Sequence, residues 1–338
     1  KPGHPGSIEN SLEKIKILID RQKIFNSQTK NKNFNFKYID DIINDCIIYG
    51  VIPFAICARH AFISQTILES FKTKNIVSSY SIEKFKNSLN TVTSRFLRDI
   101  NSVASKKMSK KIFMKNFGHL RPGTYDINSK RYDQYKSLFV FKKQKIKKIN
   151  NYDFGAKQKI KIQKLINKNK IDINVNELIE YLKSSIVSRE FSKFIFTKSV
   201  SEILSILSSH GSKNKLLTNK ICQLKIGDFK KPINIQKKLI KKNFKKNLLC
   251  KNIKLPEVLF DNAGTYVIPY QVNNPNYITN KKIRSKIIFL KKNIEKLNLL
   301  GKIVLIEGAD PGYDWIFSRN IKGLITKYGG ANSHMAIR

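Results

Sequence analysis

The chain has 338 residues, of which 41% are hydrophobic, and its formal net charge at neutral pH is +41. This length is enough for more than one hydrophobic core, so we expect two domains. We expect no secretory signal, and we expect lysines to interrupt the apolar runs before they reach the roughly 18 residues that span a bilayer. We therefore expect a cytoplasmic protein with no membrane partner.

The positive charge comes mostly from lysine, since only 10 of the 65 basic residues are arginine. Arginine is the residue that contacts phosphates and bases through two hydrogen bonds, so nucleic acid is not the expected partner. Codons rich in A and T encode lysine, asparagine and isoleucine, and a biased genome explains their excess. The alternative is a basic nucleic-acid-binding or scaffold protein without catalysis, whose binding would weaken steeply with added salt.

The four cysteines are Cys46, Cys57, Cys222 and Cys250, and no two of them form a C-x-x-C pair. Their spacing favours neither a zinc site nor a disulfide framework. We expect buried free thiols and no metal ion held by this chain.

Apolar residues recur every three or four positions from Ile8 to about Ser209, which is typical of amphipathic helices. Ser7 precedes the first such stretch and is a candidate N-cap. The pattern predicts a mostly α-helical central domain over 1–211. Its other helical stretches are expected at 39–49, 54–71, 82–103, 175–186 and 190–207.

The pattern changes in the second half of the chain. We expect an inter-domain connection over 212–254, where lysine and asparagine dominate. Beyond it, short β-rich runs occur at 265–270, 302–307 and 322–328, with a helical stretch at 281–299 and a short helix before the last run. This order predicts a small α/β domain over 255–338, so the fold class is α plus α/β.

Gly329, Gly330, Ser333 and His334 follow the last predicted strand, and a helix is expected to begin near Asn332 to Ser333. Glycines allow close approach of a phosphate to the backbone, and a helix N-terminus favours an anion. A histidine with a pKa of about 6.5 is mostly neutral at pH 7 and able to attack phosphorus. By spacing alone, His334 is also explained as a partly exposed residue at a helix start.

The sequence TKYGGANSHMAIR (326–338) resembles the T-x-x-G-G-x-x-S-H-x-A-x-x signature of the swivelling phosphohistidine domain in phosphoenolpyruvate-utilising enzymes. This family includes phosphoenolpyruvate synthase and rifampin phosphotransferase. The segment 303–320 resembles the strand and turn that lead into that signature. Upstream, 49–63, 118–133 and 189–196 resemble the central region of phosphoenolpyruvate-synthase-like proteins.

The resemblance implies an ATP-dependent dikinase-type phosphotransferase in which His334 relays a phosphoryl group to an acceptor such as pyruvate or another small molecule. It implies that Gly329 and Gly330 shape the loop, and that Thr326 and Ser333 donate hydroxyl hydrogen bonds to the phosphoryl group. ATP and Mg²⁺ would be bound mainly by an ATP-grasp domain, as a missing N-terminal part or a separate chain. The phosphohistidine domain would be truncated at its C-terminus, and this fragment alone is expected to be inactive.

The segment 118–133 contains Gly118, Pro122 and Gly123 and is expected to be a structured loop. Its polar residues are candidates for binding an acidic acceptor or a phosphoryl group, because arginine matches carboxylate and phosphate oxygens. Equally, these residues are candidates for tying the loop together and capping helices. The candidate acceptor-binding set is Arg59, His60, His119, Arg121, Tyr125, Asp126 and Arg131.

Overall fold

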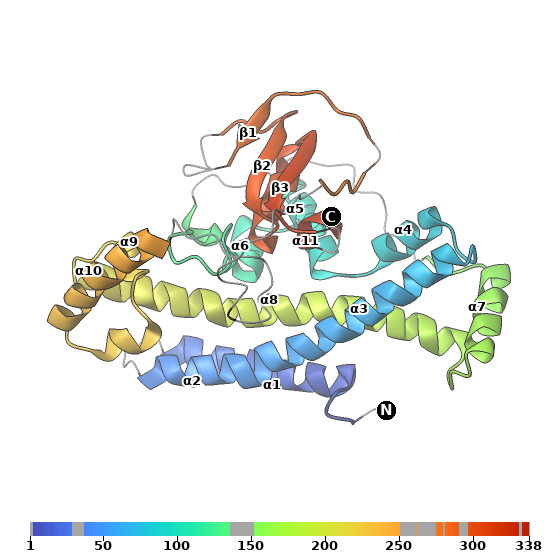
Figure 1. The fold of residues 1–338 in the computed structure, drawn as a ribbon, viewed down its shortest axis with the longest axis horizontal. Coiled ribbons are helices and arrows are strands. Elements are labelled where there is room, and N and C mark those ends of the chain that lie inside the picture. The colour runs from blue at the N-terminus through green and yellow to red at the C-terminus, as the bar shows by residue number, and fades with distance from the viewer. Residues whose placement is uncertain are drawn as a thin grey trace. The chain divides into compact units, whose positions relative to one another are not determined.

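In this computed structural model the described residues are 3–28, 37–135, 152–250, 262, 275–279, 281–290, 297–330 and 333–337. The chain divides into two compact units: unit 1 is Lys1–Leu120 with Val140–Ile203, and unit 2 is Arg121–Phe139 with Leu204–Arg338. Helices predominate, and the sheet of the described part is small and parallel (Figure 1). The expected α plus α/β class is confirmed at this coarse level. Of the described residues, 121–135 belong to the same unit as the C-terminal part of the chain.

Unit 1 is built of helices, and most of the predicted helical stretches are confirmed. Ser7 acts as the predicted cap, because its Oγ accepts a hydrogen bond from the Asn10 amide at 3.1 Å. The stretch predicted over 82–103 is two helices, since Thr91 caps a new helix by accepting from the Ser94 amide. The helices are α1 (Ile8–Gln28), α2 (Lys37–Cys46), α3 (Ile52–Thr73), α4 (Ser79–Ser88), α5 (Val92–Ala104), α6 (Lys110–Phe117), α7 (Ala156–Lys168) and most of α8 (Val175–Lys213).

A π-helical turn, η1 (Ile47–Val51), joins α2 to α3 without a break. Proline has no amide hydrogen, so Pro53 cannot donate the helical hydrogen bond to the Tyr49 carbonyl, and a widened turn lets the helix continue. Gly50 in this turn is buried. An added Cβ there would lie 2.7 Å from Cβ of Phe196 and 2.9 Å from Cδ2 of Leu18. Glycine therefore allows η1 to pack closely against α1 and α8.

The same helical stretch, Tyr38–Thr73, is long enough, and over part of its length apolar enough, to cross a membrane by length and composition alone. The expectation that lysines interrupt every apolar run is therefore wrong here, because Arg59 is the one charged residue between Cys46 and Leu68. Cys57 and Leu68 are fully buried, so this helix also contributes to the core of unit 1.

Helix α8 has 39 residues and replaces the two shorter helices predicted between 175 and 207. Its N-terminal part packs with α3, α4 and α7 around buried residues such as Leu68, Phe85 and Leu182. Further along, Phe196 packs against Ile15 of α1. Burying these apolar faces against one another provides the main stabilisation of unit 1.

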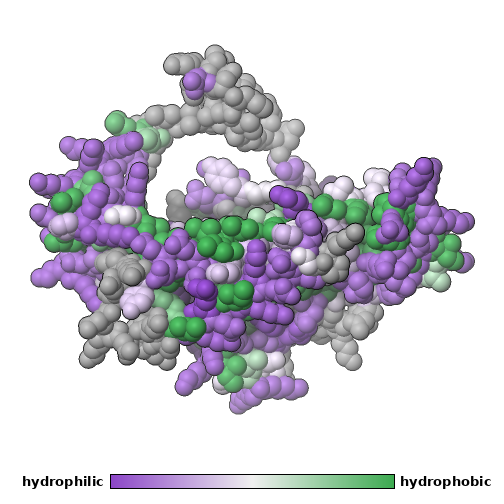
Figure 2. Space-filling model, turned by 90° about the horizontal axis from the view of Figure 1, so that it is seen from below, coloured by the Kyte–Doolittle hydropathy of each residue, from purple (hydrophilic) through white to green (hydrophobic). Residues whose placement is uncertain are grey.

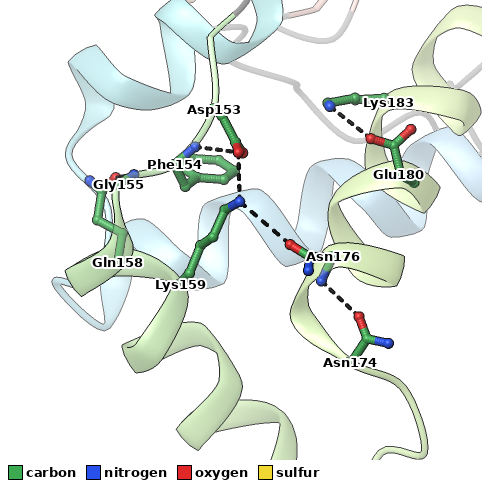
Figure 3. Close-up of polar contacts among 9 residues, drawn as sticks. All are labelled: Asp153, Phe154, Gly155, Gln158, Lys159, Asn174, Asn176, Glu180 and Lys183. Atoms are coloured by element: carbon green, nitrogen blue, oxygen red, sulfur yellow. Dashed lines mark hydrogen bonds and ion pairs between the residues drawn. The ribbon is translucent and has the colours of Figure 1, made fainter.

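A polar cluster lies where α7 and α8 begin (Figure 3). Lys159 Nζ lies 2.5 Å from Asp153 Oδ2 and 3.4 Å from Asn176 Oδ1. The Phe154 amide donates to the other Asp153 oxygen at 2.9 Å. The hydrogen bond from Lys159, reinforced by that amide, lowers the pKa of Asp153 below its usual value.

Replacing Lys159 by methionine should make unit 1 slightly less stable at neutral pH. A carboxylate whose folded pKa is lowered stabilises the fold above its unfolded pKa of about 3.9, and this contribution disappears as pH falls through the folded value. The pair is partly exposed, so we expect a loss of less than about 1 kcal/mol in the free energy of unfolding at pH 7, shrinking toward pH 3. Urea unfolding of Lys159→Met and of the exposed control Lys161→Met measures this difference, and an equal loss at both pH values would contradict it.

Unit 2 contains helices in the segment expected to be a connection. The described elements there are α9 (Thr218–Ile221), η3 (Ile226–Lys230) and α10 (Ile233–Cys250), and η2 (Tyr132–Gln134) ends the loop predicted over 118–133.

The expectation that all four cysteines are buried is wrong for two of them. Cys222 and Cys250 are exposed, whereas Cys46 and Cys57 are buried, and all four are free. Burial, with Asp45 nearby, raises the pKa of the Cys46 thiol to about 11.

The sheet of unit 2 has the order β1 (Ile287–Phe289), β2 (Ile303–Gly308) and β3 (Gly323–Tyr328), all parallel. β2 and β3 confirm two predicted strands, and the short helix predicted between them is the 3-10 helix η6 (Pro311–Arg319). The helix predicted over 281–299 is wrong at β1, whose isoleucines and phenylalanine pair with β2. The strand predicted over 265–270 lies outside the described residues.

Candidate functional site

The carboxyl ends of β2 and β3 lie side by side in unit 2, because the two strands are parallel and Gly308 pairs with Tyr328. The loop after β2 leads into η6, and the loop after β3 leads into α11 (His334–Ile337). In open α/β sheets, ligands bind outside the carboxyl ends of the strands. The segment that contains Gly329, Gly330, Ser333 and His334 therefore follows a strand end of the kind that commonly carries a ligand site.

Gly329 forms the first part of the turn and has a φ of +136°, which L side chains rarely adopt. A Cβ there would lie 2.6 Å from the Cβ of Ala309. The Ala309 amide donates to the Tyr328 carbonyl at 3.0 Å, so the two loops are in direct contact. Gly330 has open space around it, with nothing within 4 Å of an added Cβ. The glycine at 329 is thus required by conformation and by the close approach of Ala309.

Ser333 immediately precedes α11, the final helix of the described chain. Its amide donates to the Gly330 carbonyl at 2.9 Å, and its Oγ lies 3.4 Å from the Ala336 amide as an acceptor. α11 begins at His334, one to two residues after the predicted start, and the side chain of His334 lies outside the described part. Thr326 is a half-buried residue of β3 in register with Ile306, so it belongs to the strand and not to the turn.

The structure adds residues that the sequence did not single out. Asp310 caps η6 by accepting from the Gly312 amide at 2.7 Å. Its carboxylate also accepts from the Thr124 amide at 3.2 Å and from Thr124 Oγ1 at 2.5 Å. Tyr132 is fully buried, and its hydroxyl donates to the Gly312 carbonyl at 2.6 Å. An aspartate followed by proline is a local signal for a capped helix start, but nothing local connects it with Thr124.

Tyr313 lies near the start of η6. Its burial, and then the nearby carboxylates of Asp310, Glu307 and Asp126, raise the pKa of its phenol above the usual value. The phenol is therefore protonated at neutral pH and available as a hydrogen-bond donor.

Four of the candidate acceptor-binding residues lie in unit 2, namely Arg121, Tyr125, Asp126 and Arg131. Arg121 is buried and donates to the Ser129 carbonyl at 2.5 Å and to Ser205 Oγ at 2.8 Å. Asp126 accepts from the Asn128 amide at 2.9 Å. These contacts hold the loop together, whereas the side chain of Tyr125 is 58% exposed. Arg131 pairs with Asp133 at 2.8 Å.

The other candidates, Arg59, His60 and His119, lie in unit 1. Arg59 is exposed on α3. His60 contacts Tyr181 Oη at 2.9 Å through Nδ1 and the Gly6 carbonyl at 2.8 Å through Nε2. His119 is buried with its ring centroid 4.8 Å from that of Phe194. His60 and His119 therefore have structural contacts, whereas Arg59 is an exposed residue.

Within the described ranges, no group of three or more His, Cys, Asp or Glu side chains is placed to hold a metal ion. A scan of the chain against models of protein families found no match, and a search of curated proteins found no significant match either.

Proposed function

We propose that this chain is part of an ATP-dependent dikinase-type phosphotransferase in which His334 carries a phosphoryl group from ATP to an acceptor. The observation that supports this most is the segment 326–338, which carries the Thr, Gly-Gly and Ser-His positions of the phosphohistidine signature. The backbone of the segment is compatible with that role, since it follows a parallel strand and needs glycine at 329.

In the proposed reaction a neutral ring nitrogen of His334 attacks the β-phosphorus of ATP. A nitrogen–phosphorus bond forms, the bond between the β-phosphorus and the oxygen of AMP breaks, and AMP leaves. Water then removes the γ-phosphate, so that AMP and inorganic phosphate are the products besides the phosphohistidine. Dividing the transfer into two steps at a covalent histidine lowers the barrier of each.

The second step passes the phosphoryl group to an oxygen of pyruvate or of another small molecule, which regenerates the histidine. We propose that ATP and Mg²⁺ are bound by an ATP-grasp domain outside this chain, so the chain alone is inactive. Arg59 is an exposed candidate, and its guanidinium is able to attract an acidic acceptor. Gly329 and Gly330 would shape the phosphoryl loop, and Ser333 and Thr326 would offer hydroxyl groups.

The test is labelling of the full-length protein with ATP that carries ³²P in the β-phosphate. The protein should acquire a label that is labile in acid and stable in base, as expected for a phosphorus–nitrogen bond. His334→Ala should abolish the label, because the substitution removes the nucleophile. His4→Ala, which changes an exposed histidine of unit 1, is the matched control and should label normally. Undiminished labelling of His334→Ala would defeat the proposal.

The alternative of a nucleic-acid-binding protein stays a prediction, and α10 is the part of the structure that favours it. Six lysines of this helix are exposed, and hydrophilic residues cover much of the surface drawn in Figure 2. Lysines on such a face neutralise phosphates without reading sequence, so the affinity would fall steeply with salt. These lysines are Lys237, Lys238, Lys241, Lys242, Lys245 and Lys246.

A further inference from the structure

The loop 121–132 is bonded to the loop that follows β2, although nearly two hundred residues separate them in sequence. Thr124 is 8% exposed, and both its amide and its hydroxyl donate to the carboxylate of Asp310. Hydrogen bonds to an ionised carboxylate are stronger than those between neutral groups. Thr124 therefore holds the same carboxylate that caps η6, and its hydroxyl donates to the Asp310 oxygen, Oδ1, that also accepts from the Gly312 amide.

A second contact joins the same two loops at Gly312, which is two residues after Asp310. The buried Tyr132 hydroxyl donates to the Gly312 carbonyl at 2.6 Å. Gly312 leaves no room for a side chain, because an added Cβ would overlap the Arg121 carbonyl and lie 2.9 Å from Cα of Pro122. The two backbones are thus packed directly against each other.

The loop after β2 in turn contacts the turn that leads to His334. Ala309, next to Asp310, donates its amide to Tyr328 and lies where a side chain at Gly329 would be. Met335 of α11 is 4% exposed, and α11 packs against η6. A continuous set of contacts within unit 2 therefore connects Thr124, through Asp310 and Ala309, to the glycine turn.

We propose that Thr124 and Tyr132 are positioning residues for the phosphohistidine turn. By holding Asp310 and Gly312, they fix the loop against which Gly329 turns, and so they set the position of the backbone that carries His334. This inference rests on the proposed relay function of His334. It assigns the loop 121–132 to the histidine side of the reaction.

The experiment compares four forms of the full-length protein: the unchanged protein, Thr124→Val, Thr124→Ser and the control Thr66→Val. Thr66 is an exposed threonine of α3 in unit 1, whose hydroxyl donates within its own helix to Phe62. The rate and final extent of labelling from β-³²P-ATP are measured at several ATP concentrations, together with the thermal unfolding midpoint.

Valine removes the hydroxyl of Thr124 at nearly constant shape, so the turn should be held less accurately. We expect the labelling rate at saturating ATP to fall about 10- to 100-fold, since small displacements of a reacting group have effects of that size. The final extent and the ATP concentration for half-saturation should be unchanged. Thr124→Ser keeps the hydroxyl and should restore the rate, and Thr66→Val should have no effect.

A wild-type labelling rate in Thr124→Val, or equal slowing in Thr124→Ser, would overturn this inference while leaving His334 as the relay. Absence of label in the unchanged protein would overturn both the relay and the inference. If Thr124→Val does not fold, Tyr132→Phe decides the matter, because it removes only the hydroxyl that contacts Gly312. Tyr132→Phe must then slow labelling, and a wild-type rate in that variant counts against the inference.

Discussion

Gly312→Ala should separate the loop 121–132 from η6 and strongly destabilise unit 2. The new methyl group would occupy the position of the Arg121 carbonyl, and Cα of Pro122 lies 2.9 Å away. Backbone atoms cannot rotate aside as the end of a flexible side chain does, so one of the two loops must move. Overpacking costs about 1–3 kcal/mol where side chains can adjust, and we expect about 3 kcal/mol or more here.

Thermal unfolding and limited proteolysis measure this effect, because a displaced loop exposes backbone to proteases. Gly308→Ala is the matched control in the same segment, since nothing lies within 4 Å of its added Cβ. Faster cleavage within 121–135 is expected in Gly312→Ala alone. Equal stability and equal cleavage of the two variants would show that the close approach of Gly312 to Arg121 is not present in solution.

Gly50→Ala should destabilise unit 1, although alanine favours helices over glycine by about 1 kcal/mol. Its Cβ would lie 2.7 Å from Cβ of Phe196, an atom next to the backbone of α8 that cannot retreat, and 2.9 Å from Leu18. The cost of overpacking is about 1–3 kcal/mol, so the net effect is a loss of stability.

Urea unfolding followed by circular dichroism measures the stability of this variant. Gly227→Ala serves as the control, because open space surrounds its added Cβ. A Gly50→Ala protein that is more stable than the unchanged protein would mean that helix propensity outweighs the contact between η1 and α8.

The helices of unit 1 were predictable because each one buries a single apolar face, and that face repeats in the sequence every three to four residues. Their ends were less predictable. Thr91 starts a new helix inside a stretch that appears continuous, and α8 runs through a position where a break was expected. Both outcomes depend on how neighbouring helices pack, and periodicity does not contain that information.

At β1 the sequence pattern predicted a helix where the structure has a strand. Lysines and apolar residues around Ile287 alternate in a way that also fits a helix, and the strand forms because Ile287 pairs with Ile303 of β2. Pairing with a distant strand is a tertiary effect that overrides local propensity.

The candidate site was partly predictable for a similar reason. Gly329, Gly330, Ser333 and His334 are close in sequence, so their turn was visible as a motif. The contact between Thr124 and Asp310 joins positions 186 residues apart, and no local sequence pattern predicts it.

In the part of the chain that the structure describes, β2 is the central strand, and β1 and β3 pair with its two edges. The outer edge of β3 pairs with no strand among the described residues. Ile325 and Tyr328 of β3 are exposed, and an open apolar edge invites pairing with another molecule. Exposed lysines, Lys322 and Lys327, lie beside and within this strand. Charge repulsion between such edges opposes aggregation, so the lysine excess of the chain has a physical benefit here whatever its genetic origin.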